Sequence, residues 1–248
     1  AAGLGMRSTS LMMVDLEYDS KNLLLLTVRT NASATGETDY VLIDRVKERL
    51  ASVPGVQSVS YVRTFARSVD MVRTEGGPQA VRANTYIIGP DYFQTMGLSP
   101  SAGRTLTAAD RERSGAMAMI NQNLADTLCP AQSPLGKTMT LRALTFRGLS
   151  DAETGGVEVV GVMPNAFVFG FNPERPAPRP NLIFMVEQQV FATPGRAPYL
   201  REITFYLRHG RSDFESVASV LGPVLREIDP RLAIASINTM DARLEGVT

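Results

Sequence analysis

The chain has few of the residues that most often carry out chemistry: one cysteine, one histidine and no tryptophan. A single cysteine, Cys129, cannot form an intrachain disulfide, so cysteine usage does not identify the redox compartment. One histidine and one cysteine are also too few for a zinc site built from the usual nitrogen and sulfur ligands. No Asp-x-Asp-x-Asp-Gly calcium loop occurs. The sequence therefore predicts no metal ion and no cofactor.

An excess of charge and a long apolar run are missing as well. The 25 basic and 25 acidic residues give a formal net charge of zero, whereas a nucleic-acid-binding protein normally has a basic surface. No run of eighteen or more apolar residues is present, so no membrane span is predicted. Residues 1–7 also lack the pattern of a signal peptide. The length of 248 residues suits one large domain or two small ones.

The sequence patterns that come closest to catalytic sites are incomplete. Gly136-Lys137-Thr138 resembles the end of a phosphate-binding loop, but Ala131 stands where the first glycine is needed and Pro134 removes a backbone donor. We interpret this segment as a turn that leads into a strand. His209 lies near Asp213, but no Gly-x-Ser-x-Gly elbow occurs, so it is interpreted as a histidine in a surface turn. No catalytic residue is predicted.

Two further positions receive structural interpretations. Cys129 precedes Pro130 and is expected to be a small buried apolar residue rather than a reactive thiol. Residues 110–113, Asp-Arg-Glu-Arg, are expected to form a solvated turn, with a role in binding a partner as the alternative.

The two ends of the chain show the same plan of strand, helix and strand. Apolar residues at helical spacing lie between short β-branched or alternating segments in both regions. The first unit is predicted as a strand over 22–30, a helix over 39–52 and a strand over 56–63; the second as a strand over 202–208, a helix that begins at Ser212 or Asp213 and is kinked by Pro223, and a strand over 232–237. Two such units normally pack as one split sheet.

The middle of the chain is predicted to be rich in β-strands and turns. Strands are expected over 81–88, 116–120, 138–144, 157–162 and 181–184, short helices over 90–96 and 122–128, and an extended proline-rich loop over 172–180. The predicted fold class is therefore α+β. Residues 1–67 and 199–248 form a base of two β-α-β units, and residues 68–198 form a β-rich lobe inserted between them.

One aromatic cluster is a candidate surface for a partner. Alternation along the segment 167–171 places Phe167, Phe169 and Phe171 on one face. The three rings either pack into the core or form an exposed apolar lip that a partner protein covers. Both interpretations stay open at the level of the sequence.

Several short segments, in a fixed order, resemble one protein family. They are Gly89-Pro-Asp-Tyr-Phe-Gln-Thr-Met-Gly97, Gly103-Arg104, Thr107-x-x-Asp110, Asn121-x-x-Leu124-Ala125, Leu128-Cys129-Pro130, Pro134-Leu-Gly-Lys137 and Val159-Val-Gly-Val-Met-Pro164. Together they resemble the extracytoplasmic core domain of MacB-like and FtsX-like ABC-transporter permeases. The chain departs from the family at Cys129, where tryptophan is usual, and at Ser99–Ala102, where an apolar and basic stretch is more common.

The resemblance implies a fold and a function. The base would be a membrane-proximal, porter-like subdomain and the inserted lobe a sabre-like one, outside the bacterial inner membrane and between two membrane helices. Residues 1–16, predicted as a helix, would be either a surface helix or the outward continuation of a membrane helix. The domain itself would be non-catalytic and would couple ATP hydrolysis in the cytoplasm to efflux or mechanotransmission.

The partners implied by the resemblance are the flanking membrane helices, a cytoplasmic nucleotide-binding ATPase, a second permease copy and a periplasmic adaptor protein. Two alternatives remain. One is a soluble extracytoplasmic module that binds a small ligand, which predicts a deep apolar pocket with a few polar groups. The other is a hydrolase, which the absence of a nucleophile and base disfavours.

Overall fold

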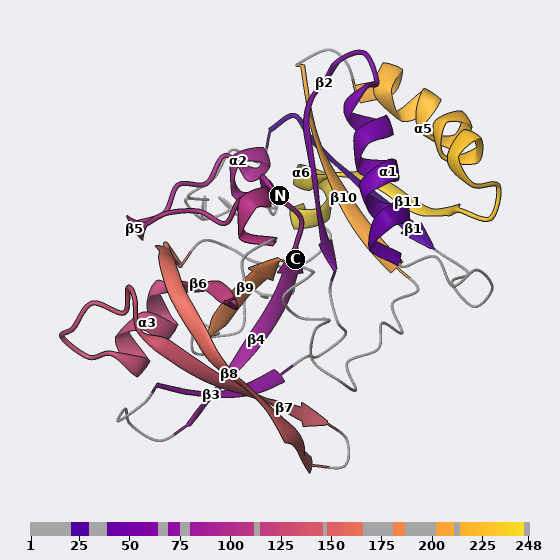
Figure 1. Ribbon diagram of the computed structural model, residues 1–248. Helices are drawn as coiled ribbons and strands as arrows, with labels where there is room; N and C mark the ends of the chain where they lie inside the picture. Colours follow the sequence, from indigo (N-terminus) through magenta and orange to yellow (C-terminus); the bar gives the residue numbers. More distant parts are fainter. Residues whose placement is uncertain are drawn as a thin grey trace, which may run out of the picture.

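The structure is a computed structural model and describes most of the chain (Figure 1). The described residues are 21–29, 39–63, 69–74, 80–111, 115–145, 148–165, 181–186, 202–210 and 214–245. The segments predicted as a helix over 1–16 and as a proline-rich loop over 172–180 lie outside this part.

The two ends of the chain form one four-stranded antiparallel sheet. Its strands and helices are β1 (Leu23–Arg29), α1 (Asp39–Ala51), β2 (Val56–Arg63), β10 (Glu202–His209), α5 (Phe214–Ile228) and β11 (Ala233–Thr239). The strands lie in the order β11-β1-β10-β2, which is the arrangement of a split, ferredoxin-like pair of β-α-β units. Pairing of β10 with both β1 and β2 confirms the predicted contact between residues 22–63 and 201–238.

The helices α1 and α5 cover one face of this base sheet (Figure 1). Apolar residues recur at helical spacing along both helices, so each helix has one apolar stripe to bury. Pro223 lies inside α5, which continues through it to Ile228. The core on this side joins Leu24 and Leu26 of β1 and Phe205 of β10 to Ile43, Val46 and Leu50 of α1 and to Val217, Leu221 and Leu225 of α5.

The opposite face of the base sheet is covered too. Leu23 and Leu25 point away from the helices because side chains alternate along a strand, yet each is only 1% exposed. Tyr206 of β10 is also 1% exposed, although its alternating pattern predicted a half-buried strand. A second layer must therefore lie on this face.

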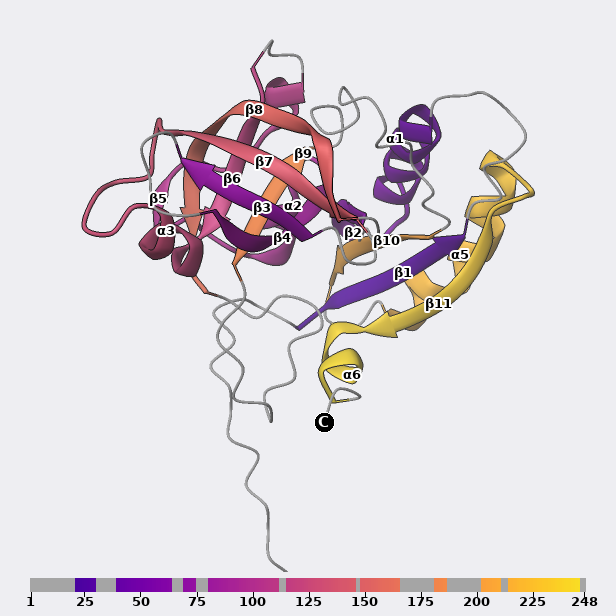
Figure 2. The same cartoon turned by 90° about the horizontal axis from the view of Figure 1, so that it is seen from below.

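The middle of the chain provides that layer. It contains β3 (Val69–Thr74), β4 (Val81–Ile88), α2 (Tyr92–Met96), β5 (Ala102–Gly103), η1 (Ala108–Arg111), β6 (Met117–Asn121), α3 (Gln122–Leu128), β7 (Thr138–Thr145), β8 (Gly148–Met163) and β9 (Leu182–Val186). Six of these strands pair in the order β4-β3-β7-β8-β6-β9, and β9 pairs again with β4. The insertion is therefore a closed barrel, whose strands lie together on one side of Figure 2.

The barrel has its own apolar interior. Ala118 and Ile120 of β6, Val157 and Val159 of β8 and Ile183 and Met185 of β9 are all almost completely buried. The short helix α3 packs on this core through Leu124 and Leu128, and Cys129 lies beside them with 5% of its surface exposed. The prediction that Cys129 is a buried apolar residue is confirmed.

Several elements differ from the prediction, among them β5, which was not predicted, and η1, part of which was expected to be a turn. The strand β3 was not predicted, because its sequence Val-Asp-Met-Val-Arg-Thr alternates only weakly; it forms by pairing with β4 and β7. The strand β8 begins at Gly148 instead of 157, since pairing with β7 extends it through a polar, glycine-rich stretch. The helix α6 (Met240–Glu245) follows β11 directly and buries Met240.

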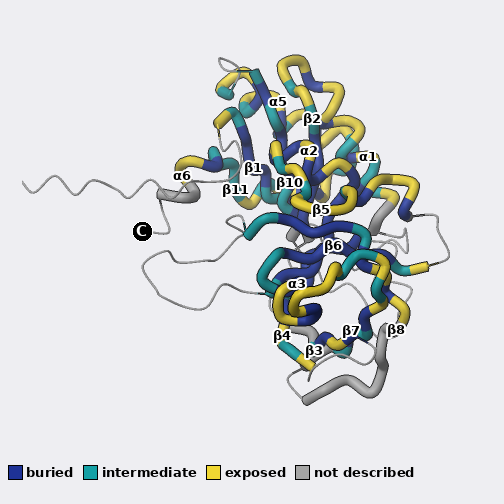
Figure 3. The backbone as a smooth tube through the Cα atoms, turned by 90° about the vertical axis from the view of Figure 1, so that its left-hand side faces the viewer, coloured by how far each residue is buried: buried dark blue, intermediate teal, exposed yellow. Residues whose placement is uncertain are grey.

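The base and the barrel are joined by strand pairing and by a shared core. The end of β2 pairs with β4 at Val62 and Ile88. One apolar cluster includes Leu25 and Tyr206 of the base together with Tyr86 and Phe184 of the barrel. Buried residues accordingly run through the strands of both parts, as the dark blue tube in Figure 3 shows. The exact division at residues 67–68 and 198–199 stays a prediction.

Candidate functional site

The helix α2 and the residues before it lie where the barrel meets the base (Figure 1). The segment is short because both of its ends have backbone dihedrals that do not continue a helix. Asp91 precedes the helix with φ 62°, and Gly97 ends it with φ 70°. The amides of Gly97 and Leu98 donate to the carbonyls of Gln94 and Phe93, which satisfies the last turn. The sequence thus encodes a short connector whose two ends are fixed by left-handed residues.

Polar contacts fasten this connector to the base sheet. The amide of Gly89 donates to the carbonyl of Tyr61 at 2.8 Å, and the hydroxyl of Ser60 donates to the carbonyl of Pro90 at 2.8 Å. A Cβ at Gly89 would lie 2.7 Å from the ring of Tyr61. The close approach therefore requires glycine at this position.

Arg208 of β10 ties the other end of the connector to the base. Its Nε donates to the carbonyl of Thr95 at 2.8 Å, and its Nη1 donates to the carbonyl of Lys21 at 3.1 Å. One guanidinium therefore bridges α2 and the residues immediately before β1. On the outer side, Lys47 of α1 and Asp91 form an exposed ion pair at 3.4 Å.

Aromatic side chains fill the space between α2 and its two neighbours. The rings of Tyr92 and Tyr206 meet edge to face with centroids 5.6 Å apart. The ring of Phe93 meets Phe184 of β9 in the same way at 5.2 Å. Such contacts contribute roughly 0.5–1.5 kcal/mol each beyond the burial of apolar area. We call the contacts of residues 89–97 with β2, β10 and β9 the α2 joint.

The side chain of Thr95 is the one buried polar group among the described residues that has no hydrogen-bond partner. Thr95 is 0% exposed, so its hydroxyl lost its water on folding without compensation. We expect Thr95→Val to raise the free energy of unfolding by about 1 kcal/mol, because valine has the same shape without the hydroxyl. Urea denaturation measures the change. Thr95→Ser is the control: it keeps the hydroxyl, loses a methyl group and should lower stability, and a destabilised valine variant would show that the hydroxyl has a partner.

The segment Gly103–Asp110 begins at the pairing of β5 with β8, at the edge of the barrel. The carboxylate of Asp110 accepts from Nη1 and Nη2 of Arg104, both at 2.8 Å. It also accepts from the amide and the hydroxyl of Thr107, at 2.8 and 3.1 Å. Asp110 is 1% exposed, so the interpretation of this residue as part of a solvated turn was wrong. Its charge is used inside the domain, in the contacts with Arg104 and Thr107 that we call the Asp110 lock.

These contacts also set the protonation of the pair. Burial alone would raise the pKa of Asp110, but the hydrogen bonds from Arg104 and Thr107 outweigh it and hold that pKa below its ordinary value. The hydrogen bond to Asp110 in turn raises the pKa of Arg104. The ion pair is therefore present across the neutral range of pH.

Two glycines allow β5 to lie against β8. A Cβ at Gly103 would meet the carbonyl oxygen of Val160 at 2.3 Å, and one at Gly161 would meet the carbonyl oxygen of Arg104 at 2.2 Å. Gly103 also has φ +74°, a conformation that suits glycine. Both positions thus serve the fold by close backbone contact.

Four asparagines form a hydrogen-bonded network at one end of the barrel. Asn121, 2% exposed, accepts from the amide of Leu182 at 2.9 Å and donates to Oδ1 of Asn165 at 2.9 Å. Asn165 also accepts from the amide of Asn123, whose side chain donates to Asn181 at 2.7 Å. Because Asn165 and Asn181 both bond to Asn123 of α3, the network holds these two residues close together.

The described residues contain no group of three or more histidine, cysteine, aspartate or glutamate side chains that could hold a metal ion. The segment 136–138 is a turn that leads into β7, as predicted. His209 is 5% exposed, so the prediction of a surface histidine was wrong. Its Nδ1 lies 2.7 Å from the carbonyl of Gly210 and its ring packs near Phe214. Phe167, Phe169 and Phe171 lie outside the described residues.

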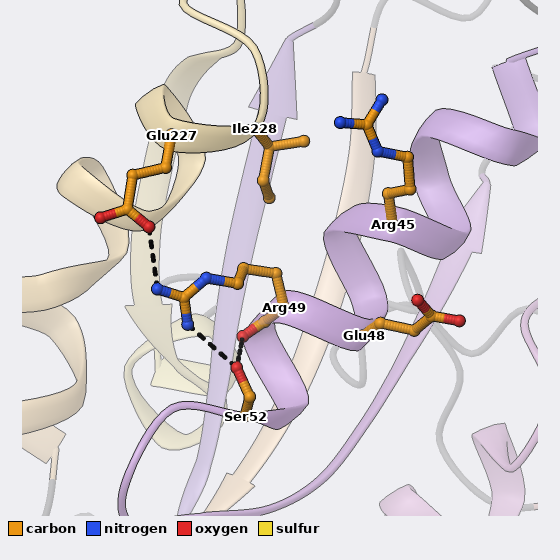
Figure 4. A pocket seen from close by; sticks show the side chains of 6 residues that line it. All are labelled: Arg45, Glu48, Arg49, Ser52, Glu227 and Ile228. Carbon is orange, nitrogen blue, oxygen red and sulfur yellow. Dashed lines mark hydrogen bonds and ion pairs between the residues drawn. The ribbon is translucent and has the colours of Figure 1, made fainter.

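A groove of about 480 Å³ lies between α1 and α5 (Figure 4). Arg45, Glu48, Arg49 and Glu227 provide most of its lining. Arg49 and Glu227 face each other across it at 2.8 Å, and both are well exposed. A small-molecule site is usually mostly apolar, so this charged groove does not match one.

The fold and the joint define a class: an α+β domain in which a ferredoxin-like base carries a closed β-barrel. The sequence profile of the MacB-like periplasmic core domain matches residues 1–220, and the chain belongs to that family. It is accordingly an extracytoplasmic domain of an inner-membrane protein. In the described part of the chain, no helix is long and apolar enough to cross a membrane.

Individual relatives agree with this assignment. The chain is 32% identical over 129 residues to the macrolide export ATP-binding/permease protein MacB of Aggregatibacter actinomycetemcomitans, covering 51% of the chain and 20% of that protein. It is 38% identical over 71 residues to the MacB of Sodalis glossinidius, covering 27% of the chain and 11% of that protein. The chain thus spans a fifth or less of the length of these relatives.

Solved structures share the fold. The periplasmic region of MacB from Actinobacillus actinomycetemcomitans superposes with a TM-score of 0.58 at 16% identity, covering 95% of this chain and 96% of that one. The extracellular domain of the ABC-type transporter YknZ from Gram-positive bacteria superposes with a TM-score of 0.55 at 15% identity, covering 86% of this chain and all of that one. The predicted family and the α+β fold class are confirmed.

Proposed function

We propose that the domain is a non-catalytic relay that couples ATP hydrolysis in the cytoplasm to movement in the cell envelope. The α2 joint is the observation that supports this proposal. A movement of the base can reach the barrel only if the two parts are firmly connected. Hydrogen bonds from Ser60 and Arg208, together with the aromatic contacts of Tyr92 and Phe93, provide such a connection.

The partners of this relay follow from the family. The relatives are named as ATP-binding/permease proteins for macrolide export, so we propose flanking membrane helices, a cytoplasmic nucleotide-binding ATPase and a second permease copy as partners. A periplasmic adaptor protein is a further proposed partner, and efflux or mechanotransmission is the proposed output. The domain itself is proposed to have no enzymatic activity.

The alternative function, a module that binds a small ligand, has less support. It predicts a deep apolar pocket with converging polar groups. The groove between α1 and α5 is instead lined mainly by charged side chains.

The relay is tested in the full permease that contains this domain, reconstituted with its ATPase. Arg208→Met keeps the length of the side chain but removes the hydrogen bonds to Thr95 and Lys21. We expect transport per ATP hydrolysed to fall about tenfold, because loss of two charge-assisted hydrogen bonds of about 1.5 kcal/mol or more each loosens the joint. The domain on its own should hydrolyse no ATP.

Arg226→Met is the matched control, since Arg226 is an exposed residue of α5. It should leave the ratio of transport to hydrolysis unchanged. An unchanged ratio together with undiminished ATP hydrolysis in the Arg208 variant would contradict the relay. Loss of ATP hydrolysis in the same proportion would instead mean that the permease is misassembled, which circular dichroism and thermal unfolding of the isolated domain would check.

The phenylalanine-rich segment remains a proposal for a partner surface. Phe167, Phe169 and Phe171 belong to a stretch whose two flanking residues, Asn165 and Asn181, are held by the asparagine network. An apolar aromatic cluster of this kind, when exposed, often marks a surface that a partner covers.

A further inference from the structure

The strand β11 is the outer strand of the base sheet. It pairs with β1 along one edge, and no described strand pairs with its other edge. Figure 2 shows β11 on the outside of the sheet, beyond β1. An edge of this kind presents a row of backbone donors and acceptors that another extended strand can bind.

Charge and proline are missing from this edge. The strand reads Ala-Ile-Ala-Ser-Ile-Asn-Thr over residues 233–239, without a lysine, a carboxylate or a proline. Proteins commonly use those residues to block pairing between sheet edges. Charges flank the strand on both sides: Arg231 and Asp229, paired with each other at 2.6 Å, precede it, and Asp241 follows it in α6. No charge and no proline within the strand opposes pairing with a second strand.

A bulge gives this edge an apolar side. Ser236 is opposite Thr27 and Ile234 is opposite Val28, so Ala235 is an extra residue in β11. The extra residue brings Ile234 and Ile237 onto the same face, the one that the helices cover. Both isoleucines pack against the core of the base but remain partly exposed. They need a neighbour to complete their burial.

The sequence of the edge is complementary to itself. In an antiparallel pair about a two-fold axis, Ile234 can lie opposite Ile237 of a second copy, and Ile237 then lies opposite the second Ile234. In each copy, two residues separate Ile234 from Ile237. The two strands therefore match residue for residue across the contact, and the bulge does not shift one isoleucine away from the other. Two pairs of β-branched side chains would form on one face, and such pairs stabilise a sheet.

We propose that the outer edge of β11 is the surface through which two copies of this domain associate, in an isologous antiparallel strand pair. The inference rests on the proposed function, which includes a second permease copy, and it says where the two copies meet. The pairing would extend two four-stranded base sheets into one continuous sheet. Membrane helices that hold two copies together would raise their effective concentration and favour the contact.

The test measures self-association of the domain from micromolar to millimolar concentration by sedimentation equilibrium. Ala235→Lys places a charge at an exposed edge position, where it faces the second copy. We expect it to weaken association about tenfold or more, since like charges meet near the two-fold axis. Val220→Lys, at an exposed valine on α5, is the control and should have no effect. Ala233→Lys, also at an exposed edge position, replaces the first variant if that one fails to fold.

Each outcome decides the inference. Association that Ala235→Lys weakens and Val220→Lys leaves intact supports it. Association that responds to Val220→Lys instead, or to neither change, places the contact elsewhere and overturns it, and so does a monomer at millimolar concentration. None of these results bears on the relay, which the transport ratio of the Arg208 variant tests separately.

Discussion

Replacement of the buried carboxylate by Asp110→Ala is expected to lower the free energy of unfolding by about 3 kcal/mol. The change removes four hydrogen bonds at once and leaves the amide of Thr107 without its acceptor. It also leaves Arg104 without its counter-charge, although the side chain of Arg104 is 43% exposed and can regain some water. Urea denaturation measures the loss, provided that the dependence of the free energy of unfolding on urea concentration keeps the same slope in both proteins.

The control is a second arginine–carboxylate ion pair with the same shortest distance and different burial. Arg49 and Glu227 also lie 2.8 Å apart, but the side chain of Glu227 is 61% exposed, against 2% for Asp110. Glu227→Ala should therefore cost less than about 1 kcal/mol. Similar losses for the two variants would show that burial does not strengthen the Asp110 lock.

The same lock makes stability depend on pH. The pKa of Asp110 is lowered in the folded state, so its contribution is complete above the ordinary pKa of an aspartate, about 4. The contribution is lost as the pH falls through the lowered pKa of the folded state. Asp110→Asn should lack this component, and the difference in stability between wild type and variant should shrink below about pH 4.

Gly103→Ala is expected to lower the free energy of unfolding by about 3 kcal/mol, or to prevent folding altogether. Alanine at φ +74° is strained, at about 1–2 kcal/mol. Its Cβ would also lie 2.3 Å from the backbone oxygen of Val160, which cannot move aside as a flexible side chain could. Such overpacking adds about 1–3 kcal/mol. Thermal unfolding of the purified domain measures the sum.

Gly136 offers a control that separates the two causes. It has nearly the same dihedral, φ +75°, but a Cβ there would meet nothing within 4 Å. Gly136→Ala should therefore show only the strain of the left-handed conformation, about 1–2 kcal/mol. If the two alanine variants lose equal stability, the contact between β5 and β8 is looser than the structure indicates.

The sequence predicted the base well because its elements have strong local signals. The four leucines of β1, the apolar stripe of α5 and the Pro54-Gly55 stop after α1 each indicate one structure by spacing and turn chemistry. Closure of the barrel could not be predicted in this way. It depends on the parallel pairing of β4 with β9, which joins residues about a hundred positions apart and has no local pattern.

The sequence predicted the segment of the α2 joint as a family motif but did not predict the contacts that the joint makes. The segment Gly89–Gly97 was recognised, but its contacts with Ser60 and Arg208 come from strands that are distant in the chain. Asp110 was misread for a similar reason. It begins a run of charges, which suggests a solvated turn, whereas its burial depends on Arg104 and Thr107 folding over it.

Closure of the barrel also bears on aggregation. The strand β9 reads Leu-Ile-Phe-Met-Val, and all five residues are buried; an uncharged apolar strand of this kind, free at one edge, could seed cross-β stacking. In the folded domain β9 has β4 on one edge and β6 on the other. Recruitment of this segment into a fibril therefore requires the barrel to open, so the ring of strands that forms the lobe also shields an aggregation-prone strand.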